Sequence, residues 1–176
     1  MAIKTAKQQL CDLYNAANPT LPHALTVDDF RTGTRGARDP IGESLANFVV
    51  SVGATDESLH FTGSISFVYR RMPVGFTTQY IEDKHSAWAD DATLIARLNS
   101  DLQVQYPNDE LGEDESGENG SFTIKRSEGE TAQHLEIIVT IANHLKFLDT
   151  EITYTIYEAV EKTDLSTADG ELDDFN

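Results

Sequence analysis

The fold of this chain is decided by the stretch Leu59-His60-Phe61-Thr62-Gly63-Ser64-Ile65-Ser66-Phe67-Val68-Tyr69. An L-x-F motif opens the stretch, and apolar and polar residues then alternate. Such alternation indicates a β-strand with one buried face. The same order returns further along, where Leu145-Lys146-Phe147 precedes the alternating run 151–156, at an offset of 86 from the first motif. The sequence therefore predicts a repeated unit.

A second pair of landmarks repeats at nearly the same offset. Leu10-Cys11-Asp12-Leu13-Tyr14-Asn15 corresponds to Leu94-Ile95-Ala96-Arg97-Leu98-Asn99, 84 residues later. Apolar residues around both motifs recur at three- and four-residue spacing, which predicts helices over 3–17 and 92–104. Two offsets that agree to within two residues favour a duplication, and chance similarity between two amphipathic segments is the alternative.

The remaining elements follow from local patterns. Residues 31–44 hold three glycines, three arginines and a proline, and are expected to form a loop. Alternation of apolar and polar residues predicts five strands, at 46–53, 61–71, 121–126, 134–142 and 149–158.

The predicted fold class is α+β, with two related units that each consist of a short helix followed by an antiparallel three-stranded meander. The first unit is expected to cover 1–75, and a partly packed linker 76–90. The second unit is expected to cover 91–160. An acidic flexible tail over 161–176, disordered or ordered by a partner, completes the organisation.

The formal charge is −17, from 13 basic and 30 acidic residues. Nucleic acid and anionic membrane surfaces are therefore not expected partners, because a polyanion is bound by clustered Lys and Arg. The acids gather at 109–118 and 161–174, which indicates solvated loops and tails. A protein that mimics nucleic acid would also carry such a charge.

The single cysteine and the hydropathy of the chain indicate where in the cell the protein is expected. The single cysteine, Cys11, excludes an internal disulfide and lies on the apolar face of the first helix, so we expect a buried thiol. The N-terminal residues lack the apolar run of a secretory signal, and no run approaches the ~20 apolar residues that span a bilayer. We expect a soluble protein made in a cytoplasm.

No motif predicts catalysis, a cofactor or a metal site, and we expect the protein not to be an enzyme. The five histidines form no ligand pair, His134 and His144 being ten residues apart. The acidic segment 108–120 lacks the alternating ligand order of an EF-hand, which leaves cation binding there open. Gly33-Thr34-Arg35-Gly36 lacks the lysine of a phosphate-binding loop.

The positive charges in so acidic a chain are a local feature. Two interpretations stay open for the arginines: pairing with acids of the same chain, or docking against the acidic loop or tail of a neighbouring copy. Trp88, the only tryptophan, is expected either to anchor an interface or to pack between the two halves. The candidate interface residues are Arg31, Arg35, Arg38, Arg70, Arg71 and Trp88.

Several short motifs resemble those of a known family. They are Leu13-Tyr14-Asn15-Ala16-Ala17-Asn18-Pro19, Leu25-Thr26-Val27-Asp28-Asp29-Phe30, Phe48-Val49-Val50-Ser51-Val52 and the stretch from Leu59 to Arg70. The pattern resembles a small domain, often repeated, of virion structural proteins from very large contractile-tailed bacteriophages. The second half is similar through 94–99 and 145–149, but it has Asp149-Thr150-Glu151 where the first half has Gly63-Ser64.

The resemblance implies a virion component of the tail, baseplate or fibre region, assembled in the host cytoplasm through contacts with other virion proteins and copies of itself. It carries over no catalytic residue. A head decoration protein is the alternative within this class. From other classes come an acidic, host-directed inhibitor that mimics nucleic acid, and a sugar-binding module with Trp88 and Tyr80 as its platform.

Overall fold

The computed structural model describes residues 3–39, 42, 44–111 and 121–159. They form an α+β fold with two helices and two sheets, together with the short 3-10 helices η1 (Val27–Asp29) and η2 (His85–Trp88). The elements are α1 (Ala6–Ala17), β1 (Phe30–Ala37), β2 (Phe48–Ala54), β3 (Ser64–Tyr69), β4 (Thr78–Glu82), α2 (Asp91–Gln103), β5 (Ser121–Glu128), β6 (His134–Ala142) and β7 (Thr150–Tyr157).

The small-sheet lobe consists of α1 and the antiparallel sheet β1-β2-β3. Thr5 begins the helix with a capping box, in which its hydroxyl accepts from the Gln8 N–H and the Gln8 side chain accepts from the Thr5 N–H. Apolar side chains of the helix and of one sheet face then make a common core. Its buried members are Leu10, Cys11, Leu25, Phe30, Phe48, Val50, Val52, Phe67 and Leu145.

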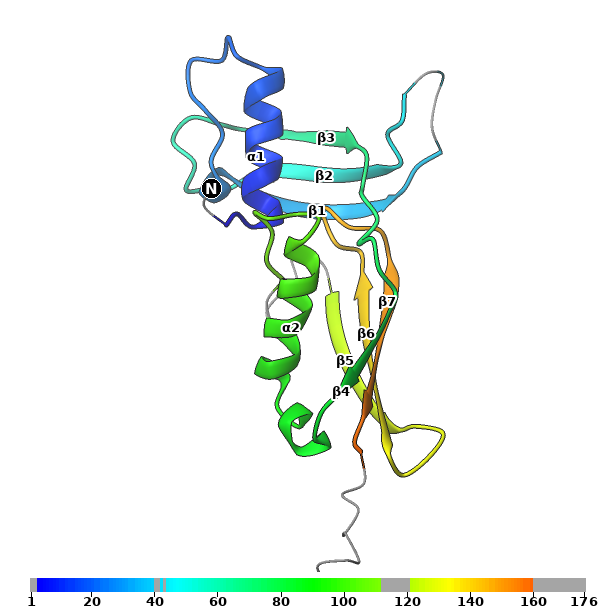
Figure 1. Ribbon diagram of the computed structural model, residues 1–176. Coiled ribbons are helices and arrows are strands. Elements are labelled where there is room, and N and C mark those ends of the chain that lie inside the picture. Colours follow the sequence, from blue (N-terminus) through cyan, green and yellow to red (C-terminus); the bar gives the residue numbers. More distant parts are fainter. Residues whose placement is uncertain (1–2, 40–41, 43, 112–120, 160–176) are drawn as a thin grey trace, which may run out of the picture.

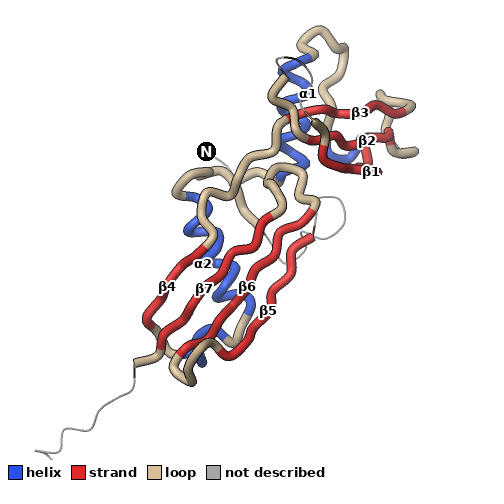
Figure 2. Tube along the Cα trace, turned by 90° about the vertical axis from the view of Figure 1, so that its right-hand side faces the viewer, coloured by secondary structure: helices blue, strands red, loops and turns tan. Residues whose placement is uncertain are grey.

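The large-sheet lobe consists of α2 and the sheet β4-β7-β6-β5, in which β4 runs parallel to β7 and the other pairs are antiparallel. Asp90 caps α2 by accepting a hydrogen bond from the Ala92 N–H. The helix covers one face of the sheet, and the other face is open (Figure 2). The buried core is Val74, Trp88, Leu94, Leu98, Leu102, Leu111, Ile137, Val139, Ile141, Phe147, Ile152, Tyr154 and Ile156.

Two predicted loops contain strands. Residues 31–44, expected as a loop, provide most of β1, because β2 offers it a backbone ladder that needs few apolar side chains. Residues 76–90, expected as a linker, contain β4 and η2. Strand β4 makes the second sheet four-stranded and mixed, which corrects the predicted three-stranded meander.

The other elements agree with their patterns to within a few residues. Both helices and all five predicted strands are present, and the Cys11 thiol is buried as expected. The predicted apolar stripe of α1 is only partly covered, since Leu13 is 61% exposed. The acidic segments lie largely outside the described residues, which omit 112–120 and 160–176.

The two lobes are stacked end to end, with the strands of the small sheet running across the direction of those in the large sheet (Figure 1). Strand β7 begins beside the small-sheet lobe and ends at the far end of the large-sheet lobe. The molecule therefore has a lobe junction at its waist and a distal end where β7 finishes.

Of the two pairs of repeated motifs, the L-x-F motifs lie in different surroundings and the helix motifs lie in similar ones. Leu59 of the first L-x-F motif is 90% exposed, whereas Leu145 of the second is 1% exposed. The helix landmarks agree better: the Asn15 side chain bonds both the N–H and C=O of Leu25, and Asn99 does the same with Leu111.

Candidate protein-protein interface

Two of the predicted arginines lie at the lobe junction. Arg35 on β1 donates from Nη1 to the Asn143 carbonyl of the large-sheet lobe, at 3.0 Å. Arg71 follows β3 and forms an ion pair with Asp149 across the junction, 2.9 Å from Nη1 to Oδ1. Both side chains therefore bind within the chain: Arg71 pairs with an acid, and Arg35 with a backbone carbonyl.

Arg71 is held on several sides. Its side chain is 6% exposed, and its guanidinium lies over the Phe48 ring at 3.9 Å from the ring centroid. Its backbone N–H donates to Asn47 Oδ1 at 2.7 Å. Planar stacking and a directed donor suit arginine better than lysine. Arg71 therefore joins the lobes and is not available to another protein.

A short backbone pairing crosses the same junction. The Met72 N–H donates to the Lys146 carbonyl and the Leu148 N–H donates to the Met72 carbonyl, both at 2.9 Å. Beside these bonds the side chains alternate between the lobes: Leu145 enters the core of the small-sheet lobe and Phe147 enters that of the large-sheet lobe. The second L-x-F motif is thus the apolar connection between the lobes.

A polar network ties α1 to the loop after α2. Lys146 Nζ lies 2.8 Å from Gln9 Oε1 and 2.5 Å from Asp109 Oδ2, and the Gln9 side-chain amide also donates to Asp109. The Asp109 side chain is 6% exposed, so its charge depends on Lys146 for compensation. This network closes the junction beneath the first turns of α1.

An apolar groove of about 240 Å³ remains open beside this network. We call it the junction groove. Leu13 is its most exposed apolar wall, and Arg70 lies on its rim without a hydrogen-bond or ion-pair partner for its guanidinium among the described residues. The groove is lined by Ala6, Gln9, Leu10, Leu13, Tyr69, Arg70, Met72, Leu145 and Lys146.

The sequence prediction missed most of this groove. Arg70 is the one lining residue among the candidate interface residues. Leu13 carried a signal, since it belongs to the apolar stripe of α1, but that pattern predicts burial. Met72 and Leu145 are more than 70 positions apart, and contacts of the folded chain, such as the parallel bridge between Met72 and Phe147, bring their segments together.

The other predicted residues do not line the groove. Arg31 pairs with Gly53 at the opposite end of the small sheet, and Arg38 follows the last residue of β1. Trp88 is 5% exposed in the large-lobe core, and its indole N–H donates to Asp83 at 3.0 Å. This corrects Trp88 as a candidate interface residue, because its own lobe covers the ring.

The small sheet also has a free edge strand beside the groove. Strand β3 pairs with β2 on one side, and the described part of the chain places no strand on its other side. Ile65 and Val68 on this strand are 54% and 43% exposed. Unpaired backbone groups along such an edge can accept a strand from another chain.

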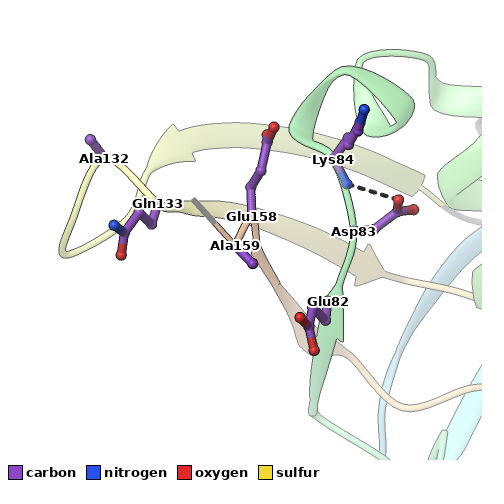
Figure 3. Close-up of a pocket in the computed structure, with 7 residues that line it drawn as sticks. All are labelled: Glu82, Asp83, Lys84, Ala132, Gln133, Glu158 and Ala159. Carbon is purple, nitrogen blue, oxygen red and sulfur yellow. Dashed lines mark hydrogen bonds between the residues drawn. The ribbon is translucent and has the colours of Figure 1, made fainter. Parts of the chain in front are cut away.

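The distal end of the large-sheet lobe is mainly acidic, in contrast to the arginine on the rim of the junction groove (Figure 3). Glu82, Asp83 and Glu158 surround an open hollow of about 690 Å³ together with Lys84, whose backbone N–H donates to Asp83 at 2.8 Å. Strand β7 ends here, and the described chain ends at Ala159.

The histidines and acids give no metal site in the described ranges, where no group of three or more His, Cys, Asp or Glu side chains is placed to hold an ion. His144 is buried, and its Nδ1 accepts from the N–H groups of Lys146 and Phe147 at 3.1 Å. Most of the acidic segment 108–120 lies outside the described residues.

Comparisons with protein-family models, curated proteins and solved structures gave no match for this chain. Of the helices in the described residues, none is long and apolar enough to cross a membrane.

Proposed function

We propose that this chain is a non-enzymatic structural component of a tailed-phage virion, in the tail, baseplate or fibre region, and that it assembles through the junction groove. The observation that carries the proposal is the exposed apolar wall formed by Leu13 beside the free edge strand β3. An apolar hollow next to an unpaired strand is a surface that a protein partner can bury. The resemblance of the sequence motifs supplies the virion context.

We also propose that the chain is built from two related units. The matching bonds of Asn15 to Leu25 and of Asn99 to Leu111 support this, because both asparagines occupy the last position of the repeated helix motif. Each helix also precedes three consecutive antiparallel strands, β1-β2-β3 or β5-β6-β7. The differing L-x-F sites then mark where the units diverged.

The test is the protein content of purified particles. Particles from the phage that encodes this chain are dissociated into heads and tails, and each fraction is analysed by peptide mass spectrometry. We expect this chain in the tail fraction at an abundance comparable with other structural proteins. Recovery with heads would instead support the head decoration alternative, and absence from both fractions would refute the virion role.

A pair of variants connects the groove to assembly. Leu13→Asp places a charge on the groove wall, and Leu59→Asp makes the same change at a residue that is 90% exposed and does not line the groove. Both variants should keep the wild-type circular dichroism spectrum. Only Leu13→Asp should reduce incorporation into particles when supplied in place of the wild type.

A second candidate function is sugar binding on the open face of the large sheet. Tyr80 is 80% exposed there, and the strand register aligns it with Thr155 and Glu136. These residues, together with Tyr157, line a hollow of about 480 Å³. An aromatic ring beside hydroxyl and carboxylate groups suits a sugar ring. A glycan array tests this: binding lost in Tyr80→Ala supports it, and a blank array for the wild type refutes it.

A further inference from the structure

The residues that line the junction groove indicate which kind of ligand it can bind. Its floor is apolar, from the buried Leu10 and Leu145, Leu13 forms an exposed apolar wall, and the guanidinium of Arg70 lies on its rim. Lys146 is already compensated by Asp109, so Arg70 is the cation that an incoming ligand can pair with. A short peptide that combines apolar side chains with a carboxylate fits these features.

The chain itself contains such a peptide. Residues 160–176 carry six acids and one lysine, a net charge of −5. Within them the sequence Glu171-Leu172-Asp173-Asp174-Phe175 places two large apolar residues three positions apart, with acids between and before them. In a chain with a net charge of −17, most acidic side chains only increase the electrostatic repulsion between copies. Here they accompany the apolar residues that the groove floor can bury.

We propose that the junction groove of one copy binds the segment 165–176 of a second copy, with Leu172 and Phe175 on the apolar floor and Asp173 or Asp174 beside Arg70. This inference rests on the proposed function, because it names the partner of the same groove.

The geometry favours a second copy over the same chain. Leu148 lies at the lobe junction and Ala159 at the distal end, so β7 separates them by about 35 Å at ~3.3 Å per strand residue (Figure 1). The residues from 160 to Leu172 reach about 45 Å when fully extended. Binding within one chain therefore requires the segment to span about three-quarters of its fully extended length, which costs much of its conformational entropy. A neighbouring copy imposes no such path.

Binding between copies would be head to tail. The segment leaves from the distal end of one molecule and enters the waist of the next, so the two contacting surfaces differ. Such heterologous contacts generate rings where the rotation closes and filaments where it does not. Either outcome suits a repeated component of a particle.

A peptide titration tests the contact directly. The receptor is the full chain with Leu172→Ser and Phe175→Ser, which removes the apolar residues of its own segment. The probe is a fluorescent peptide of residues 165–176, and binding is measured by anisotropy. We expect saturable binding that Leu13→Asp weakens about tenfold or more and that Leu59→Asp leaves unchanged.

A charge exchange tests the position of the acids. Arg70→Glu should weaken peptide binding about fivefold, within the range of an exposed charge pair. A peptide with Asp173→Arg and Asp174→Arg should recover binding to that receptor. Arg31→Glu is the matched control, since it makes the same charge change at the far end of the small sheet. Binding that is insensitive to both Leu13→Asp and Arg70→Glu would overturn the proposed site.

The oligomeric state distinguishes a failure of this inference from a failure of the proposed virion role. In sedimentation velocity the wild type should form larger species as concentration rises, and the Leu172→Ser, Phe175→Ser variant should stay monomeric. A wild type that stays monomeric, and whose own segment keeps the labelled peptide out of its groove, would show binding within one chain and overturn the proposal. If the double variant associates and enters particles as the wild type does, the virion role survives and this inference fails.

Discussion

Asn15 and Asn99 hold equivalent positions in the two helices and make the same pair of backbone hydrogen bonds. Asn15 accepts from the Leu25 N–H at 2.8 Å and donates to its carbonyl at 2.9 Å. Asn99 accepts from the Leu111 N–H and donates to its carbonyl, both at 2.8 Å. Both leucines are buried. Each asparagine therefore fixes the chain that leaves its helix and brings an apolar side chain into the core.

Replacing these asparagines should destabilise both lobes to different extents. Asn99→Ala leaves a buried N–H and a buried C=O without partners, which should cost about 2–3 kcal/mol of unfolding free energy. Asn15 is only half-buried, so water can satisfy part of the loss and Asn15→Ala should cost about 1–2 kcal/mol. Urea denaturation measures both, with the exposed Ser100→Ala in α2 as the control. Equal and negligible costs would contradict the role assigned to these bonds.

The buried Arg71 should matter far more than its neighbour. Arg71→Ala removes the stacking on Phe48 and leaves Asp149 without its cation, and we expect a loss of about 2–3 kcal/mol. Asp149 is 55% exposed, so water limits the cost. Arg70→Ala is the matched control and should change the free energy of unfolding by about 0.5 kcal/mol or less. A similar loss for both variants would show that the junction does not depend on Arg71.

The regular elements of this fold are readable from the sequence because each has a strong local pattern. Strand β6 occupies the predicted residues 134–142, where alternation is regular. Helix α2 begins next to its capping aspartate. Strand β1 escapes prediction because Gly33 and Gly36 interrupt the pattern, and its stability comes from pairing with β2. Strand β4 escapes because only Ile81 and Gln79 face the packed side.

The junction groove escapes prediction for a different reason. Its walls come from α1, from the chain after β3 and from the loop before β7, and no local pattern links these segments. The arginine at 71 illustrates the same limit. Its pairing with Asp149 joins residues 78 positions apart, whereas the sequence states only that a positive charge in an acidic chain finds an acid.

The protein should lose stability in alkaline solution through groups buried as neutral acids. Burial raises the pKa of the Cys11 thiol from 9.0 to about 11, and burial likewise raises the pKa values of the Tyr69 and Tyr154 phenols. The unfolded chain releases these protons at lower pH than the folded chain does. The contribution of Cys11 to stability is therefore complete below pH 9 and is lost as the pH rises through 11. The contribution of the two tyrosines is complete below pH 10, their ordinary pKa, and is lost only at higher pH than that of Cys11.

Cys11 can be separated from the tyrosines by substitution. Urea denaturation of the wild type at pH 8 and pH 10.5 should show a lower free energy of unfolding at the higher pH. Cys11→Ala should remove on the order of 1 kcal/mol of that difference, although it lowers stability at both pH values. A pH dependence that is identical in Cys11→Ala would contradict the raised thiol pKa.

The two lobes should unfold together, because the L-x-F motif at 145–147 packs into both cores. Leu145 belongs to the small-lobe core and Phe147 to the large-lobe core, with one residue between them. Each core contains a natural reporter: Trp88, the only tryptophan, in the large-sheet lobe and Cys11, the only cysteine, in the small-sheet lobe. Trp88 fluorescence and Cys11 reactivity toward a thiol reagent, both followed in urea, should give the same midpoint.

Shortening the apolar connection should separate these transitions. Leu145→Ala removes a side chain that is 1% exposed, and its loss should cost about 2–4 kcal/mol. Because that side chain fills the small-lobe core, Cys11 should become reactive at a lower urea concentration than the one at which Trp88 fluorescence changes. Two separate midpoints in the wild type would mean that the lobes are stable independently and that the junction contributes little. Coincident midpoints in both proteins would place the coupling in the polar contacts of Arg71 and Lys146.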